Sequence, residues 1–264
     1  MSALPAVDVR HREQQARTQI ASEDIDALII TSPTNIRWLT GFAGSNGAVV
    51  LTQNRLTLIT DSRYQDRAPT ELDSVASSAE LVIERAEIAQ AARTAVGGAV
   101  RVGLEADHVS WAHMQTIAAD WLDGLTVVPT TQVLDELRAR KDEAEVARIR
   151  AAANIVDAAL AEVQDQLAAQ LTERQFAQTL DAAIRGGGAE DLGFDTIVAS
   201  GPNGAIPHHS PGDRVIVPGD LVIIDVGAKV DGYRSDMTRT FCVGPMSTDQ
   251  RRHYDVVALS LIHI

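Results

Sequence analysis

Two aspartates within an apolar stretch are the residues of this sequence best suited to chemistry. Asp225 interrupts the run Leu221–Ala228, and Asp236 lies in the run Arg234–Phe241. The dipeptide Asp231-Gly232 between the runs is typical of a hairpin turn. A carboxylate in a buried strand costs free energy unless its charge is compensated, and two such carboxylates repel one another unless a cation lies between them. The pair is therefore a candidate site for divalent cations, and the two residues alone do not decide between that site and a structural role.

The spacing of these aspartates predicts which face of the hairpin each would occupy. A loop of even length puts Asp225 and Asp236 on the same face, opposite or diagonal according to where the turn is centred, whereas an odd loop separates them. Carboxylates on one face suit divalent metals, and a bridging carboxylate suits two metals ~3.5–4 Å apart. A structural alternative stays open, in which Asp225 accepts backbone hydrogen bonds and Asp236 pairs with Arg234 or Arg239.

The elements that would position this hairpin begin near residue 140. Asp142 with Glu145 resembles a capping box that opens a long helix. Thr172 with Gln175 opens a second helix, which the glycines at 186–188 end. The first helix has apolar residues in steps of three and four, which favours packing on a sheet over a coiled coil. These residues are Val146, Ile149, Ala153, Val156, Leu160, Val163 and Leu167.

Before residue 140 the pattern alternates between helical and strand-like runs, which predicts an α/β domain. We place the domain boundary there, giving domains of residues 1–140 and 141–264. The predicted helices cover residues 7–21, 88–96 and 111–122, the last capped by Ser110. The predicted strands cover residues 26–31, 48–52, 56–60, 81–83 and 101–105, and a glycine-rich loop lies at 41–47.

Composition narrows the class of protein. The chain has 264 residues, a formal net charge of -13 and one cysteine, Cys242. The acidic charge argues against nucleic acid as a ligand, and no apolar run approaches the ~20 residues of a membrane span. One cysteine and no visible secretory signal predict a reduced, cytoplasmic setting.

Three separated motifs resemble one known family. The run from Asp225 to Phe241, D-V-G-A-x-x-x-G-Y-x-S-D-x-T-R-T-F, resembles the first metal-ligand hairpin of the pita-bread metallopeptidases, in the branch of Xaa-Pro dipeptidases (prolidases) and Xaa-Pro aminopeptidases. The segment Phe194–His208 resembles the family's active-site histidine segment. Asn35–Gly47 and Thr60–Tyr64 resemble the creatinase-type N-terminal domain that precedes the catalytic domain.

The resemblance implies a fold and residue roles. The fold would be an α/β creatinase-type domain, a mixed sheet with flanking helices, followed by the first half of an α+β pita-bread domain. Asp225 would bind one metal and Asp236 would bridge two. His208 would hydrogen-bond the substrate or tetrahedral intermediate, while His209 would be a neighbour with no direct role.

The activity implied is hydrolysis of an Xaa-Pro bond by a hydroxide that bridges two metals. The substrate would be a dipeptide, or a peptide N-terminus, with proline at the second position. Manganese is the first expectation because carboxylate and water ligands suit Mn²⁺, with cobalt, zinc or iron as alternatives, and the full-length parent would be a homodimer. Two other functions stay open: a non-catalytic interaction module, and a metal-independent creatinase-like hydrolase.

The sequence departs from the family at its end. The family's remaining ligands, a histidine and two glutamates, come later in its chains, whereas this sequence stops at Ile264. His253 and His263 lie on or just beyond a helix opened by Ser247 and Gln250, and they do not match ligand positions. We therefore expect a truncated copy with negligible peptidase activity.

Overall fold

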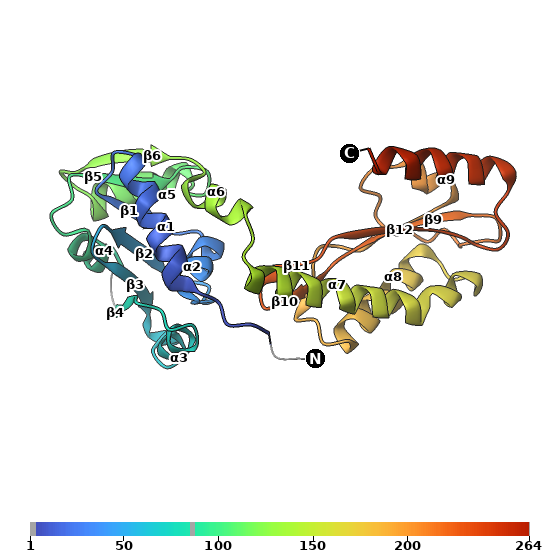
Figure 1. Ribbon diagram of the computed structural model, residues 1–264, viewed down its shortest axis with the longest axis horizontal. Helices are drawn as coiled ribbons and strands as arrows, with labels where there is room; N and C mark the ends of the chain where they lie inside the picture. The colour runs from blue at the N-terminus through green and yellow to red at the C-terminus, as the bar shows by residue number, and fades with distance from the viewer. Residues whose placement is uncertain (1–3, 85–87, 264) are drawn as a thin grey trace. The chain divides into compact units, whose positions relative to one another are not determined.

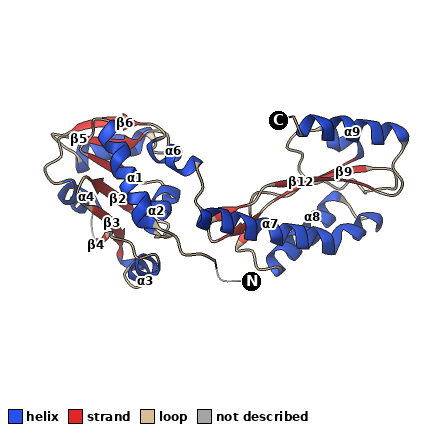
Figure 2. Ribbon diagram, in the orientation of Figure 1, coloured by secondary structure: helices blue, strands red, loops and turns tan. Residues whose placement is uncertain are grey.

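The computed structural model describes residues 4–84 and 88–263 (Figure 1). These form two compact units, one of residues 6–141 and the other of residues 142–263 together with residues 4–5. Helices and strands alternate along the first unit, and the second combines helices with antiparallel strands (Figure 2). The predicted order, an α/β part followed by an α+β part, is confirmed.

A mixed six-stranded sheet forms the middle of the first unit. Its strands are β1 (Ala27–Ile30), β2 (Ala48–Thr52), β3 (Leu56–Asp61), β4 (Glu80–Glu84), β5 (Arg101–Glu105) and β6 (Thr126–Thr130), in the order β4-β3-β2-β1-β5-β6. β1 pairs in parallel with β5 and antiparallel with β2. All five predicted strands are present, and the structure adds β6.

Helices cover both faces of this sheet because alternate strand residues point to opposite sides. In β1, Leu28 and Ile30 belong to one core cluster, and Ala27 and Ile29 belong to the other. The helices are α1 (Val9–Ser22), α2 (Pro33–Thr40), α3 (Arg67–Ser74), α4 (Ile88–Val96), α5 (Trp111–Thr116) with a π-helical turn (Ile117–Trp121), and α6 (Val133–Ala139). Ser110 caps α5 as predicted, since its hydroxyl accepts from the His113 amide at 3.2 Å.

The two family-like motifs of the first unit meet through polar contacts. The side-chain amide of Asn46 donates to Oδ2 of Asp61 at 2.6 Å, and the Tyr64 hydroxyl accepts from the backbone amide of Ser45 at 3.0 Å. Hydrogen bonds from Arg63 and Asn46 hold the pKa of Asp61 well below its usual range. The glycine-rich loop is thereby fixed to the turn that follows β3.

The second unit has two small sheets and three long helices. One sheet joins β11 (Tyr233–Arg234), β10 (Ala228–Val230) and β7 (Asp191–Leu192), and the other joins β12 (Met237–Cys242), β9 (Leu221–Val226) and β8 (Ile197–Ser200). The helices are α7 (Glu143–Val163), α8 (Glu173–Gly186) and α9 (Thr248–Leu261). Each begins with the capping box that the sequence predicts.

The predicted apolar face of α7 is only partly right. Val156, Leu160 and Val163 are buried as expected, but Val146 is 39% exposed. The face instead turns inward through Ala144, Arg148, Ala152, Ile155 and Ala159. Arg148 is tolerated there because its guanidinium donates to Oδ2 of Asp231 at 2.6 Å and to the Pro5 carbonyl at 3.0 Å. The helix packs on β10, β11 and α8, so the coiled-coil alternative is excluded.

Helix α9 lies at the end of the described chain, and none of its residues is buried. Its large apolar side chains are well exposed, among them Val256, Val257, Leu259 and Leu261. The Gln250 side chain ties its first turn to the Gly219 carbonyl at 2.7 Å. No helix within the described ranges has the length and apolarity to cross a membrane.

Candidate active site

The hairpin register places the two predicted carboxylates diagonally on one face. β9 pairs with β12 so that Asp225 lies opposite Thr238. Asp236 precedes Thr238 by two residues and therefore faces the same side. The turn residues Asp231 and Gly232 both have positive φ, 45° and 79°, as a two-residue type I′ turn requires. Of the alternatives that the sequence left open, the structure shows the even-length loop in its diagonal form.

Strand alternation decides how deeply Asp225 is buried. One face of β9 is fully buried, through Val222, Ile224 and Val226. Ile223 and Asp225 share the other, half-buried face, and Asp236 is exposed. The expectation of an acid buried inside an apolar strand is therefore wrong. The Thr238 hydroxyl donates to Oδ1 of Asp225 at 2.9 Å and thereby compensates part of the carboxylate charge.

The predicted first strand of the hairpin breaks at Gly227, between the two aspartates. β9 belongs to one small sheet and β10 to the other. At the break, the Ala228 amide donates to the Ser235 hydroxyl at 3.1 Å, and the Ser235 amide donates to the Ala228 carbonyl at 2.9 Å. A Cβ on Gly227 would lie 2.1 Å from the Ser235 carbonyl oxygen. Only glycine allows the strands to approach this closely.

The arginines of the hairpin do not neutralise Asp236. Arg239 pairs with Asp157 at 3.7 Å and donates to the Thr238 carbonyl at 3.0 Å. Over the ranges 4–84 and 88–263, Asp236 takes part in no hydrogen bond or ion pair. The Tyr233 hydroxyl donates to Oε1 of Glu145 at 3.0 Å and so joins the hairpin tip to α7.

The donor set tests whether a metal pair fits these residues. Within the described part of the chain, no group of three or more His, Cys, Asp or Glu side chains is placed to hold a metal ion. Asp225 and Asp236 are two donors, and hard divalent ions take six or more. The residues present do not by themselves fit a dinuclear centre, and no reaction step through a metal follows from this geometry.

His208 lies in the loop that follows β8 and the short 3₁₀ helix η4 (Gly201–Ala205). Within that helix, a Cβ on Gly204 would lie 3.5 Å from Cδ1 of Ile223. Ile223 shares its face of β9 with Asp225, so the helix folds back over the face that carries the carboxylates. His208 itself is exposed and has a positive φ of 54°. It makes no hydrogen bond or ion pair with any residue that the structure describes.

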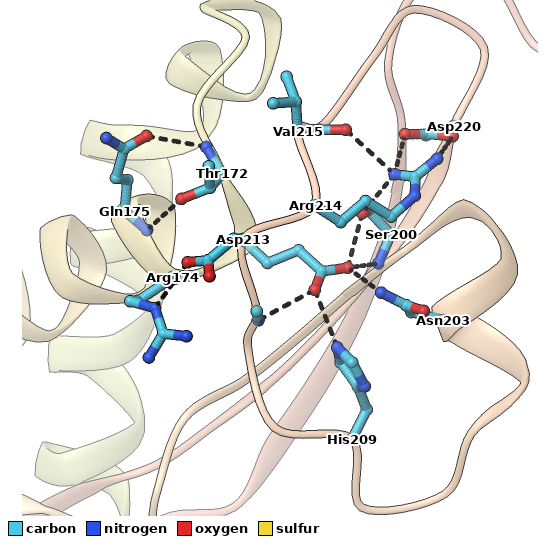
Figure 3. Close-up of polar contacts among 12 residues, drawn as sticks. Thr172, Arg174, Gln175, Ser200, Asn203, His209, Asp213, Arg214, Val215 and Asp220 are labelled. Atoms are coloured by element: carbon cyan, nitrogen blue, oxygen red, sulfur yellow. Dashed lines mark hydrogen bonds and ion pairs between the residues drawn. The ribbon is translucent and has the colours of Figure 1, made fainter.

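A buried carboxylate that the sequence did not single out anchors this loop. Glu173, the first residue of α8, has a side chain with no solvent exposure. It accepts from the Ser200 amide and hydroxyl at 2.8 and 2.7 Å, and from the Asn203 amide group at 3.0 Å. It also accepts from His209 Nε2 at 2.8 Å and from the Gly212 amide at 3.2 Å. Figure 3 shows Ser200, Asn203 and His209 converging on this point.

An ion pair extends the network to the start of β9. Arg214 donates from both terminal nitrogens to Asp220, at 2.6 and 2.9 Å, and also to the Ser200 hydroxyl at 2.6 Å (Figure 3). The Ser200 hydroxyl therefore links the Arg214–Asp220 pair to Glu173. A Cβ on Gly201 would lie 2.6 Å from both partners of that pair. The end of β8, the start of α8 and the start of β9 are thus held together.

Burial and hydrogen bonding oppose one another at Glu173. Burial raises the pKa of its carboxyl, but hydrogen bonds from Ser200, His209 and Asn203 outweigh burial and lower the pKa to about 2. At Asp220, burial likewise raises the pKa, while Arg214 and the Val217 amide bring it below its ordinary value. Both groups therefore stay ionised at neutral pH. In the sequence, Glu173 is simply an acid in the first turn of a helix, which is common.

The fold has two parts, an α/β unit followed by an α+β unit that carries the carboxylate hairpin. Residues 12–140 match the creatinase/prolidase N-terminal domain, and residues 147–264 match metallopeptidase family M24. The chain belongs to family M24, and its second unit is part of the pita-bread catalytic domain of that family.

The relatives include peptidases of several bacteria. An uncharacterized peptidase of Bacillus subtilis is 32% identical over 257 residues, which are 95% of this chain and 71% of that protein. A putative Xaa-Pro aminopeptidase of Mycoplasma pneumoniae is 32% identical over 220 residues, 83% of this chain and 60% of that protein.

Solved structures agree on the fold. An Xaa-Pro dipeptidase from Bacillus anthracis has a TM-score of 0.89 at 28% identity, and the match covers 95% of this chain and 69% of that one. An X-Pro aminopeptidase from Thermotoga maritima has a TM-score of 0.82 at 29% identity, with 91% and 69% covered. The chain thus spans 60–71% of the length of these relatives.

Proposed function

We propose that the hairpin belongs to the site of a metal-dependent peptidase that hydrolyses the Xaa-Pro bond of dipeptides or of peptide N-termini. The observation that carries the proposal is the diagonal pair Asp225 and Asp236 on one face of a hairpin, where Arg239 pairs with Asp157 and not with Asp236. In this proposal Asp225 would be a ligand of one metal ion, Asp236 would be a ligand shared by two, and His208 would hydrogen-bond the substrate. The names of the relatives, Xaa-Pro dipeptidase and Xaa-Pro aminopeptidase, support the substrate class.

The cofactor, partner and location follow the same proposal. Manganese is the preferred ion, because carboxylate oxygens and water are its usual ligands. Cobalt, zinc or iron are the alternatives. A peptide with proline at its second position is the substrate, the assembled enzyme is a homodimer, and it acts in the cytoplasm. Nucleic acid and membranes are not partners.

Mn²⁺ binding tests the metal role of the hairpin. Asp236→Asn keeps the shape of the side chain but removes its charge, so we expect it to weaken Mn²⁺ binding by about tenfold or more, as loss of a charged oxygen donor does. The measurement is the loss of the free Mn²⁺ paramagnetic resonance signal on titration. Asp255→Asn, an exposed acid on α9, is the matched control and should bind like the unaltered chain. Equal affinities for all three proteins would remove the metal role.

We also propose that the 264-residue chain by itself hydrolyses Xaa-Pro dipeptides at a negligible rate. The reason is its donor set: two carboxylates leave most positions of a metal pair unfilled. The measurement is proline release from Ala-Pro with and without Mn²⁺. Mn²⁺-dependent proline release above the blank that disappears in Asp236→Asn would contradict this expectation. It would show that the remaining metal ligands are supplied in solution.

A further inference from the structure

The loop that carries His208 has a conformation that its own sequence does not favour. His208 has φ of 54°, in the left-handed region where a side chain is disfavoured unless surrounding contacts fix the backbone. Its own side chain is exposed and cannot supply those contacts. The contacts that hold this backbone must therefore come from other residues.

Glu173 contacts the loop on both sides of His208. Ser200 and Asn203 lie before the histidine, and His209 and Gly212 lie after it. Hydrogen bonds to an ionised carboxylate are shorter and roughly twice as strong as neutral ones. All five donors reach one side chain that has no solvent exposure, so water cannot replace them.

The contact with His209 has a defined direction. An ionised carboxylate only accepts hydrogen bonds, so Nε2 of His209 carries the hydrogen that lies between the two side chains. His209 is 15% exposed and anchored, whereas the adjacent His208 is exposed and unanchored. The two neighbouring histidines thus have different roles: His209 holds the loop through Glu173, whereas the side chain of His208 is exposed.

We propose that Glu173 is a positioning residue, whose carboxylate sets the conformation of residues 201–212 and thereby presents His208 over the carboxylate face of β9. Placing the loop over that face rests on Gly204, which lies against Ile223. The importance of presenting His208 rests on the proposed function. The conformational part rests only on the contacts of Glu173.

The experiment compares Glu173→Gln with Glu162→Gln, an exposed glutamate on α7 of the same unit. Amide hydrogen exchange is followed at residues 201–212 and, as a check of the fold, at β9 and β12. NMR of the labelled chain reports the sign of φ at His208 through its strong intraresidue amide–Hα contact, and it reports which ring nitrogen of His209 carries hydrogen. A change in stability alone would not move these two signatures.

For Glu173→Gln we expect exchange at 201–212 to rise at least tenfold, the positive-φ signature of His208 to be lost, and β9 and β12 to stay protected. Glu162→Gln should match the unaltered chain. Unchanged signatures and exchange in Glu173→Gln would overturn the proposal. If β9 and β12 also lose protection, His209→Leu removes a single contact. Faster exchange at 208–212 would then support the proposal, and unchanged exchange would overturn it.

The hydrogen-exchange and NMR measurements are made without metal or substrate. A failed Mn²⁺ titration would therefore remove the proposed function and leave this result intact. A failed exchange experiment would remove the role of Glu173 and leave the metal role of Asp225 and Asp236 untouched.

Discussion

Gly227→Ala is expected to destabilise the second unit by ~3 kcal/mol or more, an effect at the upper end of overpacking substitutions. The new methyl would lie 2.1 Å from the Ser235 carbonyl oxygen and 2.9 Å from Cε1 of Phe194. Neither strand can retreat, because the Gly193 amide donates to the Gly227 carbonyl at 2.7 Å and the Ser235 amide donates to the Ala228 carbonyl at 2.9 Å. Relief of the clash must break this junction, which lies between Asp225 and Asp236.

The measurement must report on the second unit alone. All three tryptophans, Trp38, Trp111 and Trp121, lie in residues 6–141, so their fluorescence follows the other unit. We therefore follow urea unfolding by hydrogen exchange of peptides from residues 221–243. The matched control is Gly186→Ala at the end of α8, where a Cβ meets nothing within 4 Å. It should be neutral or stabilising by up to ~1 kcal/mol. An unchanged midpoint for Gly227→Ala would refute the close approach.

The hairpin was predictable because its strand alternation and its turn residues can be recognised from residues close together in the sequence. A strand repeats every two residues, and Asp231-Gly232 suits a type I′ turn, so sequence spacing alone limits the register to a few choices. The capping boxes were predictable for the same reason, since the partners Asp142 and Glu145 are three residues apart. Metal binding itself is not contained in this local pattern, and it stays a prediction.

The sequence-based predictions were wrong or incomplete where residues far apart in the sequence determine which side chains are buried or in contact. Arg148 lies on the buried face of α7, where its guanidinium donates to Asp231, 83 residues away. Asp225 escapes burial because only one face of β9 packs on the helices. Glu173 could not be singled out, because its partners lie 27 to 39 residues further along the chain and become neighbours only after folding.

The ionised carboxylate of Glu173 is expected to stabilise the second unit in a pH-dependent way. Its pKa falls from 4.5 to about 2 on folding. A group with a lowered pKa contributes stability that is fully present above its unfolded pKa and is lost as pH falls through the folded value. That difference corresponds to ~3 kcal/mol at pH 6, falling to roughly half of this at pH 3.

Other acids of the unit titrate in the same window, and not all in the same direction. Burial raises the pKa of Asp181, partly opposed by Thr196, so that group stabilises the fold as pH falls. Asp220, whose pKa is lowered, acts in the same direction as Glu173. The stability of the unaltered chain therefore mixes opposing contributions, and only a difference between matched proteins isolates Glu173.

That difference is the free energy of unfolding of the unaltered chain minus that of Glu173→Gln, measured at pH 6 and pH 3 on peptides of the second unit. We expect ~3 kcal/mol at pH 6 and about half of this at pH 3. Glu162→Gln should stay within ~0.5 kcal/mol of the unaltered chain at both values, as exposed substitutions do. A loss of equal size at both pH values would mean that the Glu173 side chain stabilises the loop through its shape and neutral hydrogen bonds, and not through its charge.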